Sequence, residues 1–92
     1  MIVDGRQSGA DPGRYDVIIV GAGPAGISMA LELERSGMRV ALLESGGEEF
    51  DPESQMLADG PVTGSADALD LAAIRLRLLG GTSLHWGGQC AP

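Results

Sequence analysis

The sequence has no lysine, one cysteine, and only one residue each of tyrosine, phenylalanine and tryptophan among 92 residues. Its six arginines against 13 acidic residues give a net charge of -7. Nucleic acids and anionic membrane surfaces require clustered positive charge, so this balance argues against both as partners. A single cysteine excludes an internal disulfide and is typical of a reducing compartment.

Long hydrophobic runs are also missing. No run approaches the roughly 18 apolar residues of a membrane-spanning helix, and residues 1–14 lack the apolar stretch of a signal peptide. We therefore expect a cytoplasmic protein without a membrane-spanning segment. The composition, with 43% hydrophobic and 21% charged residues, is that of a globular protein. Ninety-two residues allow at most one small core.

The first half of the chain predicts a strand, a helix and a second strand. The run YDVIIV, Tyr15–Val20, is continuously apolar, which is typical of a strand covered on both faces. Residues Pro24–Ser36 predict a helix, with Ile27, Ala30 and Leu31 on one face. Arg39–Leu43 predicts the second strand, parallel to the first. The order is that of a right-handed βαβ unit, so the predicted fold class is α/β.

The second half is less regular. Residues 45–65 are rich in Gly, Pro, Asp and Glu and predict a long surface excursion, to which we assign no secondary structure. Residues 66–79 have both helical and alternating spacing. We predict a short helix that passes into a strand at Ile74.

The sequence GAGPAG, Gly21–Gly26, follows the first predicted strand and opens the predicted helix. It matches G-x-G-x-x-G, and Glu44 follows at the tip of the second strand, which completes the dinucleotide-binding pattern. Gly21 permits a tight turn, Gly23 allows close approach of a pyrophosphate, and Gly26 allows close packing of helix on strand. The free amides at the helix start bind the phosphates.

Glu44 is predicted to accept hydrogen bonds from the adenosine ribose hydroxyls. A carboxylate at this position also repels a 2′-phosphate and so disfavours NADP. The alternative is that Glu44 is only a solvated residue at the end of a strand.

Taken with YDVIIVGAGPAGISMALELERSGMRVALLESGG, the closing segment RLRLLGGTSLHWGGQCAP resembles the glucose/methanol/choline oxidoreductases, which are FAD enzymes that oxidise alcohols and sugars. The resemblance implies FAD, and hydride transfer from a CH-OH group of a small alcohol or sugar to the flavin. It also implies a Rossmann-like FAD-binding domain whose sheet is incomplete in these residues. The paired glycines Gly80/Gly81 and Gly87/Gly88 are expected near the flavin ring, where Thr82 and Ser83 can cap a short helix.

His85 stands four residues after Gly81, where family members with covalently bound flavin place their histidine. Three alternatives stay open for His85: covalent attachment of FAD, non-covalent contact with the flavin, or a structural hydrogen bond. Trp86 is either a wall beside the flavin or an anchor of the core. Cys90 is interpreted as a small buried hydrophobic residue.

The predicted cofactor-binding residues are Gly21, Gly23, Pro24, Ala25, Gly26, Glu44, Ser45, Gly81, Thr82, Ser83, His85, Trp86, Gly87 and Gly88. We predict no catalytic residue and no metal ligand within the 92 residues. Arg75 and Arg77 could neutralise phosphate charge, but a solvated strand edge explains them equally well.

The expected organisation is a polar lead, residues 1–14, followed by an incomplete FAD-binding domain, residues 15–92. The family's catalytic base and its substrate domain are not in this chain, so we expect an N-terminal piece of a larger enzyme that is inactive alone. Three alternatives remain: an FAD-dependent disulfide reductase, an NAD-dependent dehydrogenase, and a non-catalytic dinucleotide-binding module. The disulfide reductase class needs a pair of cysteines that this chain lacks. The electron acceptor is not predicted.

Overall fold

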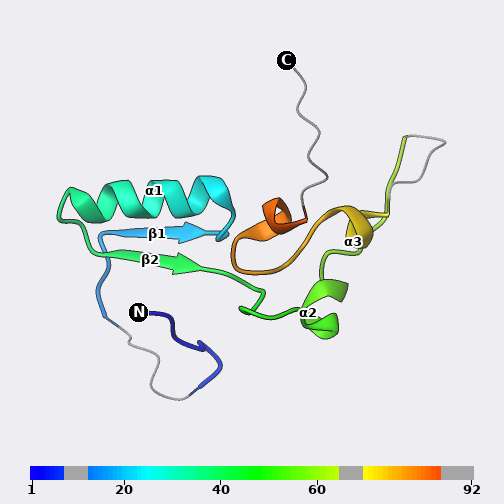
Figure 1. The fold of residues 1–92 in the computed structure, drawn as a ribbon, viewed down its shortest axis with the longest axis horizontal. Helices are drawn as coiled ribbons and strands as arrows, with labels where there is room; N and C mark the ends of the chain where they lie inside the picture. Colours follow the sequence, from blue (N-terminus) through cyan, green and yellow to red (C-terminus); the bar gives the residue numbers. More distant parts are fainter. Residues whose placement is uncertain (8–12, 65–69, 86–92) are drawn as a thin grey trace.

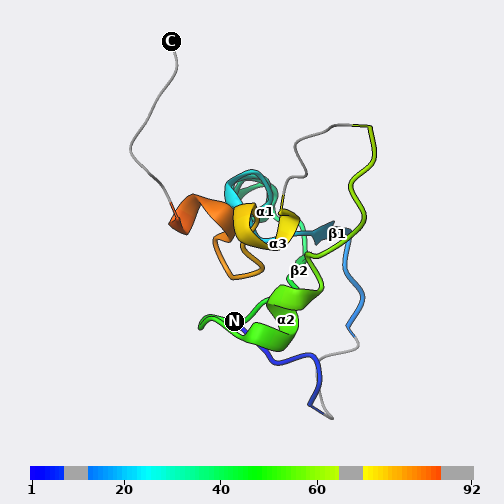
Figure 2. The ribbon, with the colours of Figure 1, turned by 90° about the vertical axis from the view of Figure 1, so that its right-hand side faces the viewer.

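The computed structural model describes residues 1–7, 13–64 and 70–85. The elements follow in the order β1, α1, β2, α2, α3 and η1, where η1 is a short 3-10 helix (Figure 1). Figure 2 shows α1 end-on above the two strands and α2 below them. The predicted Trp86, Gly87 and Gly88, and also Cys90, lie outside the described residues.

The βαβ unit is present as predicted. Strand β1, Val17–Val20, pairs in parallel with β2, Val40–Leu43, and α1, Pro24–Arg35, connects them. Val17 lies opposite Val40, and Val20 lies opposite Leu43. The α/β fold class, with the βαβ unit of a Rossmann-like domain, is therefore confirmed.

Strand β1 is shorter than the predicted Tyr15–Val20. The amides of Asp16 and Val17 both donate to the Arg39 carbonyl, at 2.8 and 3.3 Å. The Asp16 carboxylate in turn accepts from the Arg39 amide at 2.8 Å. These bonds close the start of the unit in place of a regular ladder, so the strand begins at Val17.

Helix α1 turns a half-buried face toward the sheet. Its partly buried positions are Gly26, Ile27, Ala30 and Leu33, which recur at the three- and four-residue spacing of one helix face. Leu31, predicted on this face, is 54% exposed. The face is therefore rotated slightly from the one that the sequence predicts.

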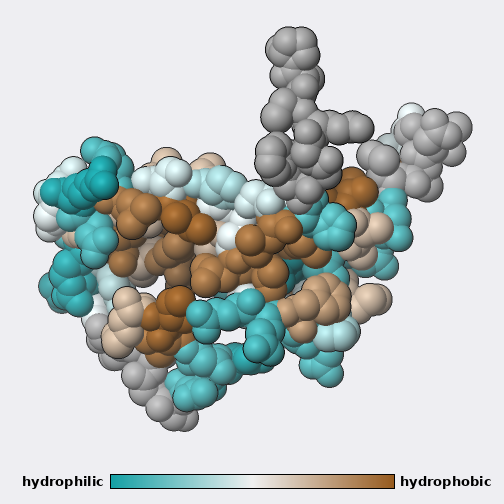
Figure 3. Space-filling view, in the orientation of Figure 1, coloured by the Kyte–Doolittle hydropathy of each residue, from teal (hydrophilic) through white to brown (hydrophobic). Residues whose placement is uncertain are grey.

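Part of the apolar surface of the sheet is open in the described part of the chain. Ile18, Val20 and Leu43 are 62, 84 and 53% exposed. Among the described residues, Ala22 is the one buried hydrophobic residue. Figure 3 shows hydrophobic surface across the middle of the molecule, where β1 and β2 lie in Figure 1. The two strands thus form an incomplete sheet, as predicted.

The excursion after β2 contains a helix that we did not predict. Helix α2, Pro52–Met56, is capped by Asp51, whose carboxylate accepts from the Glu53 and Ser54 amides at 3.3 and 3.1 Å and from the Ser54 hydroxyl at 2.6 Å. The sequence DPES carries the signal for this start, an N-cap aspartate followed by proline at the first helical position.

The strand predicted at Ile74 is wrong. Helix α3, Leu71–Ile74, is followed by an irregular segment, residues 75–79, with no strand partner among the described residues. The buried Gln55 side chain on α2 takes the place of a partner strand. Its Nε2 donates to the Ala72 and Arg75 carbonyls, both at 2.6 Å, and its Oε1 accepts from the Arg77 amide at 3.0 Å.

Replacing Gln55 with leucine is expected to destabilise the intact protein by about 1–3 kcal/mol, because it leaves one amide and two carbonyls, all in partly buried hydrogen bonds, without partners. A chemical denaturation curve measures the effect. Met56→Leu, on the exposed side of the same helix, is the control and should leave the midpoint unchanged. Equal stability of Gln55→Leu and the native protein would contradict the three hydrogen bonds described for the Gln55 side chain.

No helix within the described ranges is both long enough and apolar enough to cross a membrane.

Candidate functional site

The loop between β1 and α1 has the geometry that close approach of a ligand requires. Gly21 has φ of +104°, a left-handed conformation that side chains disfavour, and its amide donates to the Leu43 carbonyl at 2.8 Å. A Cβ added at Gly21 or Gly23 would meet no atom within 4 Å. The loop is thus fixed to the end of β2, while the space above its backbone stays open.

Gly26 differs from the other two glycines of the motif because its space is filled. A Cβ there would overlap the Gly21 carbonyl oxygen and would lie 3.5 Å from the Ile19 side chain. Gly26 therefore sets how closely α1 packs on β1, as the sequence predicts.

The start of α1 has amide groups to offer. Its N-cap is Gly23, and no side chain of the described residues caps it. The first intrahelical bond runs from the Ile27 amide to the Gly23 carbonyl at 3.0 Å. The amides of Ala25 and Gly26 precede that bond, and Pro24 has none, so two donors and the positive end of the helix dipole face outward.

The second glycine pair packs directly on the first glycine loop. The Gly80 amide donates to the Ala22 carbonyl at 2.8 Å, and a Cβ at Gly81 would come within 3.2 Å of the Gly23 Cα. Both glycines have positive φ, +96° and +66°. Two segments that are far apart in the sequence therefore form one surface, and the close contact favours the absence of a side chain at Gly81.

The predicted capping role of Thr82 and Ser83 is wrong. Helix η1, Gly81–Leu84, begins after Gly80 without a side-chain cap. The Thr82 hydroxyl accepts from the Leu76 amide at 3.0 Å, and the Ser83 hydroxyl donates to the Gly80 carbonyl at 2.7 Å. Both side chains hold the loop in place instead.

His85 lies at the end of η1 and is exposed. Its backbone amide donates to the Thr82 carbonyl at 2.9 Å. The three alternatives for its side chain remain predictions.

Glu44 is held at the end of β2 by four hydrogen bonds from the chain. Its Oε2 accepts from the Ala22 amide at 2.8 Å. Its Oε1 accepts from the Ser45 amide at 2.8 Å, the Ser45 hydroxyl at 3.1 Å and the Gly46 amide at 2.9 Å. The carboxylate therefore joins the tips of the two strands and is fixed in one orientation.

These bonds determine the charge state of Glu44. Burial, the largest single influence, raises the pKa of Glu44, but the hydrogen bonds from Gly46, Ala22 and Ser45 together lower the pKa below its ordinary value of 4.5. The fold thus stabilises the charged carboxylate.

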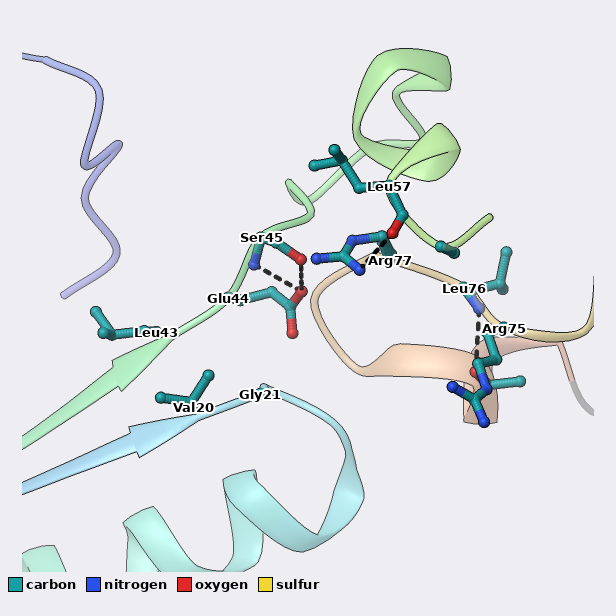
Figure 4. Close-up of a pocket in the computed structure, with 11 residues that line it drawn as sticks. Val20, Gly21, Leu43, Glu44, Ser45, Leu57, Arg75, Leu76 and Arg77 are labelled. Carbon is teal, nitrogen blue, oxygen red and sulfur yellow. Dashed lines mark hydrogen bonds between the residues drawn. The ribbon is translucent and has the colours of Figure 1, made fainter. Parts of the chain in front are cut away.

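A pocket of about 770 Å³ opens where the two parallel strands end, and Glu44 is one of the residues that line it (Figure 4). This is the position at which α/β proteins bind their ligands, and the volume is that of a small-molecule site. Its lining residues are Val20, Gly21, Leu43, Glu44, Ser45, Leu57, Ala58, Arg75, Leu76, Arg77 and Thr82.

Four of the lining residues belong to the predicted set: Gly21, Glu44, Ser45 and Thr82. The other predicted and described residues, Gly23, Pro24, Ala25, Gly26, Gly81, Ser83 and His85, lie in the two glycine segments beside it. The wall formed by residues 57–58 and 75–77 was not predicted. Its only sequence signal was the pair of arginines in RLRLL.

Comparison with known proteins places the sequence in a family. Residues 15–75, more than half of the chain, match the family described as pyridine nucleotide-disulphide oxidoreductase. The chain belongs to this family. The matched segment contains the whole βαβ unit, both ends of the nucleotide motif and most of the pocket wall.

Curated relatives of this pyridine nucleotide-disulphide oxidoreductase chain match in shorter stretches. The chain is 43% identical over 58 residues to 6-methylpretetramide 4-monooxygenase of Streptomyces rimosus, covering 54% of this chain and 14% of that enzyme. It is 59% identical over 29 residues to ubiquinone hydroxylase UbiM of Neisseria meningitidis, covering 32% of this chain and 6% of that enzyme. It is 43% identical over 58 residues to sarcosine oxidase subunit alpha of a Corynebacterium species, covering 51% of this chain and 6% of that subunit. No solved structure matches significantly.

The chain therefore spans 14% or less of the length of these three relatives. The resemblance to the glucose/methanol/choline oxidoreductases is wrong, because the family match and the relatives point to pyridine nucleotide-disulphide oxidoreductases, monooxygenases and an oxidase. Most of the glycine-rich segment on which that resemblance depended lies after residue 75, beyond the matched range. The βαβ unit and GAGPAG are shared by several flavoprotein families and could not separate them.

The predicted cofactor is confirmed, since FAD is bound by the pyridine nucleotide-disulphide oxidoreductase family. The broad prediction of membership in an oxidoreductase family is confirmed with it. The described residues fit the ADP part of FAD. Open space above Gly21 and Gly23 would be filled by any side chain, and the start of α1 offers amides without a side-chain cap.

Proposed function

We propose that residues 15–92, after a polar lead of residues 1–14, form the first part of an FAD-binding domain and hold the ADP part of FAD. One observation carries the proposal. The uncapped start of α1 and the fixed carboxylate of Glu44 lie together where β1 and β2 end. Amides beside a carboxylate suit a ligand with an anionic centre and a neighbouring sugar diol.

The pyrophosphate would lie on the start of α1. The amides of Ala25 and Gly26 point out of the first turn, and Gly23 leaves room for the phosphate oxygens. Backbone amides and the positive end of the helix dipole attract phosphate at this position without a lysine, which the chain lacks.

The adenosine ribose would lie at Glu44. Two carboxylate oxygens offer about four accepting positions. Oε2 accepts one bond from the chain, so it retains a lone pair for a ribose hydroxyl. The negative charge of Glu44 disfavours a nucleotide with a 2′-phosphate.

The flavin end would lie toward Gly81, Thr82, Ser83 and His85. When bound, the isoalloxazine ring supplies the electron-transfer chemistry of the enzyme. The chain's own contribution is to bind and orient the nucleotide. Covalent or non-covalent contact of His85 with the flavin, and a flavin contact of Trp86, Gly87 or Gly88, stay predictions.

The whole protein is proposed to oxidise a small organic molecule. The names of its relatives include monooxygenases and oxidases, which supports oxidation with flavin as the redox centre. The narrower predictions from the sequence, oxidation of an alcohol or sugar at a CH-OH group and a cytoplasmic location, stay predictions. Product analysis separates the reactions, because hydroxylation adds an oxygen atom and CH-OH oxidation yields a carbonyl.

Gly23→Ala tests the proposed phosphate site. The new methyl group meets no atom of the chain, so the fold is expected to be unchanged, but it fills the space above the loop. We expect FAD to bind about tenfold more weakly, the effect of losing one hydrogen bond to a charged group. Titration of the intact apoprotein with FAD gives the dissociation constant.

Gly5→Ala is the matched control, because a Cβ there also meets no atom within 4 Å but lies in the polar lead. It should bind FAD normally. Native affinity in Gly23→Ala would contradict the proposed site.

A further inference from the structure

Arg77 carries a guanidinium group that the protein positions but does not neutralise. Its Nη1 donates to the Leu57 carbonyl at 3.2 Å. Its Nε is buried and has no hydrogen-bond partner among the described residues. Arginines that lose solvent are normally paired with a carboxylate, yet no ion pair to Arg77 occurs in the described part of this acidic chain.

The backbone around Arg77 is locked. Its amide donates to the buried Gln55 side chain at 3.0 Å. Its carbonyl crosses Gly46 so closely that any side chain at position 46 would overlap it. Arg77 therefore cannot move away from the end of β2 without breaking this crossing, and its side chain is a fixed part of the pocket wall.

The guanidinium lies on the side of the pocket beyond Glu44. Figure 4 shows it reaching from the residue 75–79 segment toward Ser45 and Glu44, with Leu57 next to it. Arg77, Leu57 and Ala58 together present one planar cation and two apolar side chains to the pocket.

The order of groups in a dinucleotide identifies what would lie there. This step rests on the proposed function. If the pyrophosphate is on α1 and the ribose at Glu44, the base extends from the ribose away from the glycine loop. Leu57 and Arg77 lie on that side in Figure 4, and Ala58, the next residue after Leu57, also lines the pocket. A flat aromatic base fits a planar guanidinium, which stacks on ring faces, and small apolar side chains.

We propose that Arg77 is the residue that holds the adenine base of FAD, with its guanidinium plane stacked on the ring and Leu57 and Ala58 completing the site. The contact orients the nucleotide and selects ligands that carry an adenosine half. Arg77 is a binding residue and takes no part in electron transfer.

The test compares Arg77→Met and Arg77→Lys with the native intact protein, using FAD, FMN and adenosine as probes. Stacking on a base contributes about tenfold in affinity. Arg77→Met should therefore weaken the binding of FAD and the binding of adenosine by the same factor of about ten. FMN, which lacks the adenosine half, should bind both variants as it binds the native protein. Arg77→Lys should behave like Arg77→Met, because it keeps the charge but not the plane.

Arg35→Gln, which removes an exposed arginine at the far end of α1, is the control and should change nothing. Unchanged FAD affinity in Arg77→Met would overturn the proposal. Native FAD affinity in Arg77→Lys would overturn the stacking role. Weaker binding of FAD by Arg77→Met without weaker binding of adenosine would also overturn it. An equal loss of affinity for FMN and for FAD in both variants would overturn it as well. Failure of the native protein to bind FAD at all would instead refute the proposed function.

Discussion

Gly26→Ala is expected to prevent the intact protein from folding with bound FAD. Alanine within a helix usually stabilises relative to glycine, by about 0.4–1 kcal/mol where the conformation permits. Here the added methyl group would overlap the Gly21 carbonyl oxygen, which is backbone and cannot rotate away. Either α1 separates from β1 or the Gly21 turn is lost, and we expect a cost of about 3 kcal/mol or more.

Flavin content and thermal unfolding of the purified variant measure this effect. Gly47→Ala is the matched control, because its Cβ would lie 3.6 Å or more from its nearest neighbour, at ordinary contact distance. It should remain yellow and stable. A Gly26→Ala protein with full flavin content and an unchanged melting temperature would show that the helix does not pack on the strand as described.

Glu44→Gln is expected to weaken FAD binding about a hundredfold, the cost of losing a charged acceptor and leaving a donor unpaired. Glutamine has almost the same shape, but its amide nitrogen cannot accept a hydrogen bond. Whichever way the side chain turns, at least one of the amides now bound by Glu44 loses its acceptor. One of these belongs to Ala22, the fully buried residue that links the two glycine segments.

The same variant has a defined effect on pH dependence. The pKa of Glu44 is lowered in the folded protein, so its contribution to stability is present above its ordinary value of 4.5 and is lost as pH falls through the lower, folded pKa. Glu44→Gln should therefore flatten the decline in stability below about pH 4.5. Denaturation midpoints across this range, with the exposed Glu48→Gln as control, test it. An identical acid profile for both variants would contradict the hydrogen bonds described for Glu44.

The parts predicted correctly from the sequence are those that depend on neighbouring residues. The hydrophobic runs around GAGPAG define β1, α1 and β2, and the glycine spacing with Glu44 defines one wall of the pocket. Helix α2 was missed although its signal, Asp51 before Pro52, is local and readable. The strand at Ile74 was wrong for a different reason. Alternating apolar residues need a partner strand, and the partner here is a glutamine side chain from another helix.

The other wall of the pocket could not be predicted. Whether Arg77 lies at a solvated edge or beside a ligand depends on where α2 crosses, on Gln55, and on the absence of a side chain at Gly46. Each of these contacts joins residues 17 or more apart in sequence. The assignment to the wrong flavoprotein family has a related cause, because it depended mainly on residues after 75, for which single-sequence patterns gave no independent check.

The hydrogen bond from the Leu79 amide to the Gly47 carbonyl, 2.9 Å long, has a consequence for how this protein could diversify. This bond joins the two ends of the segment between residues 47 and 79. Next to it, the Gly80 amide donates to the Ala22 carbonyl. Chain added at the tip, around residues 60–64, would leave this closure in place, and doubling the length of a loop costs only about 0.6 kcal/mol. New recognition elements could thus be added there while the contact between the loop at Gly21–Gly26 and the Gly80/Gly81 pair is preserved.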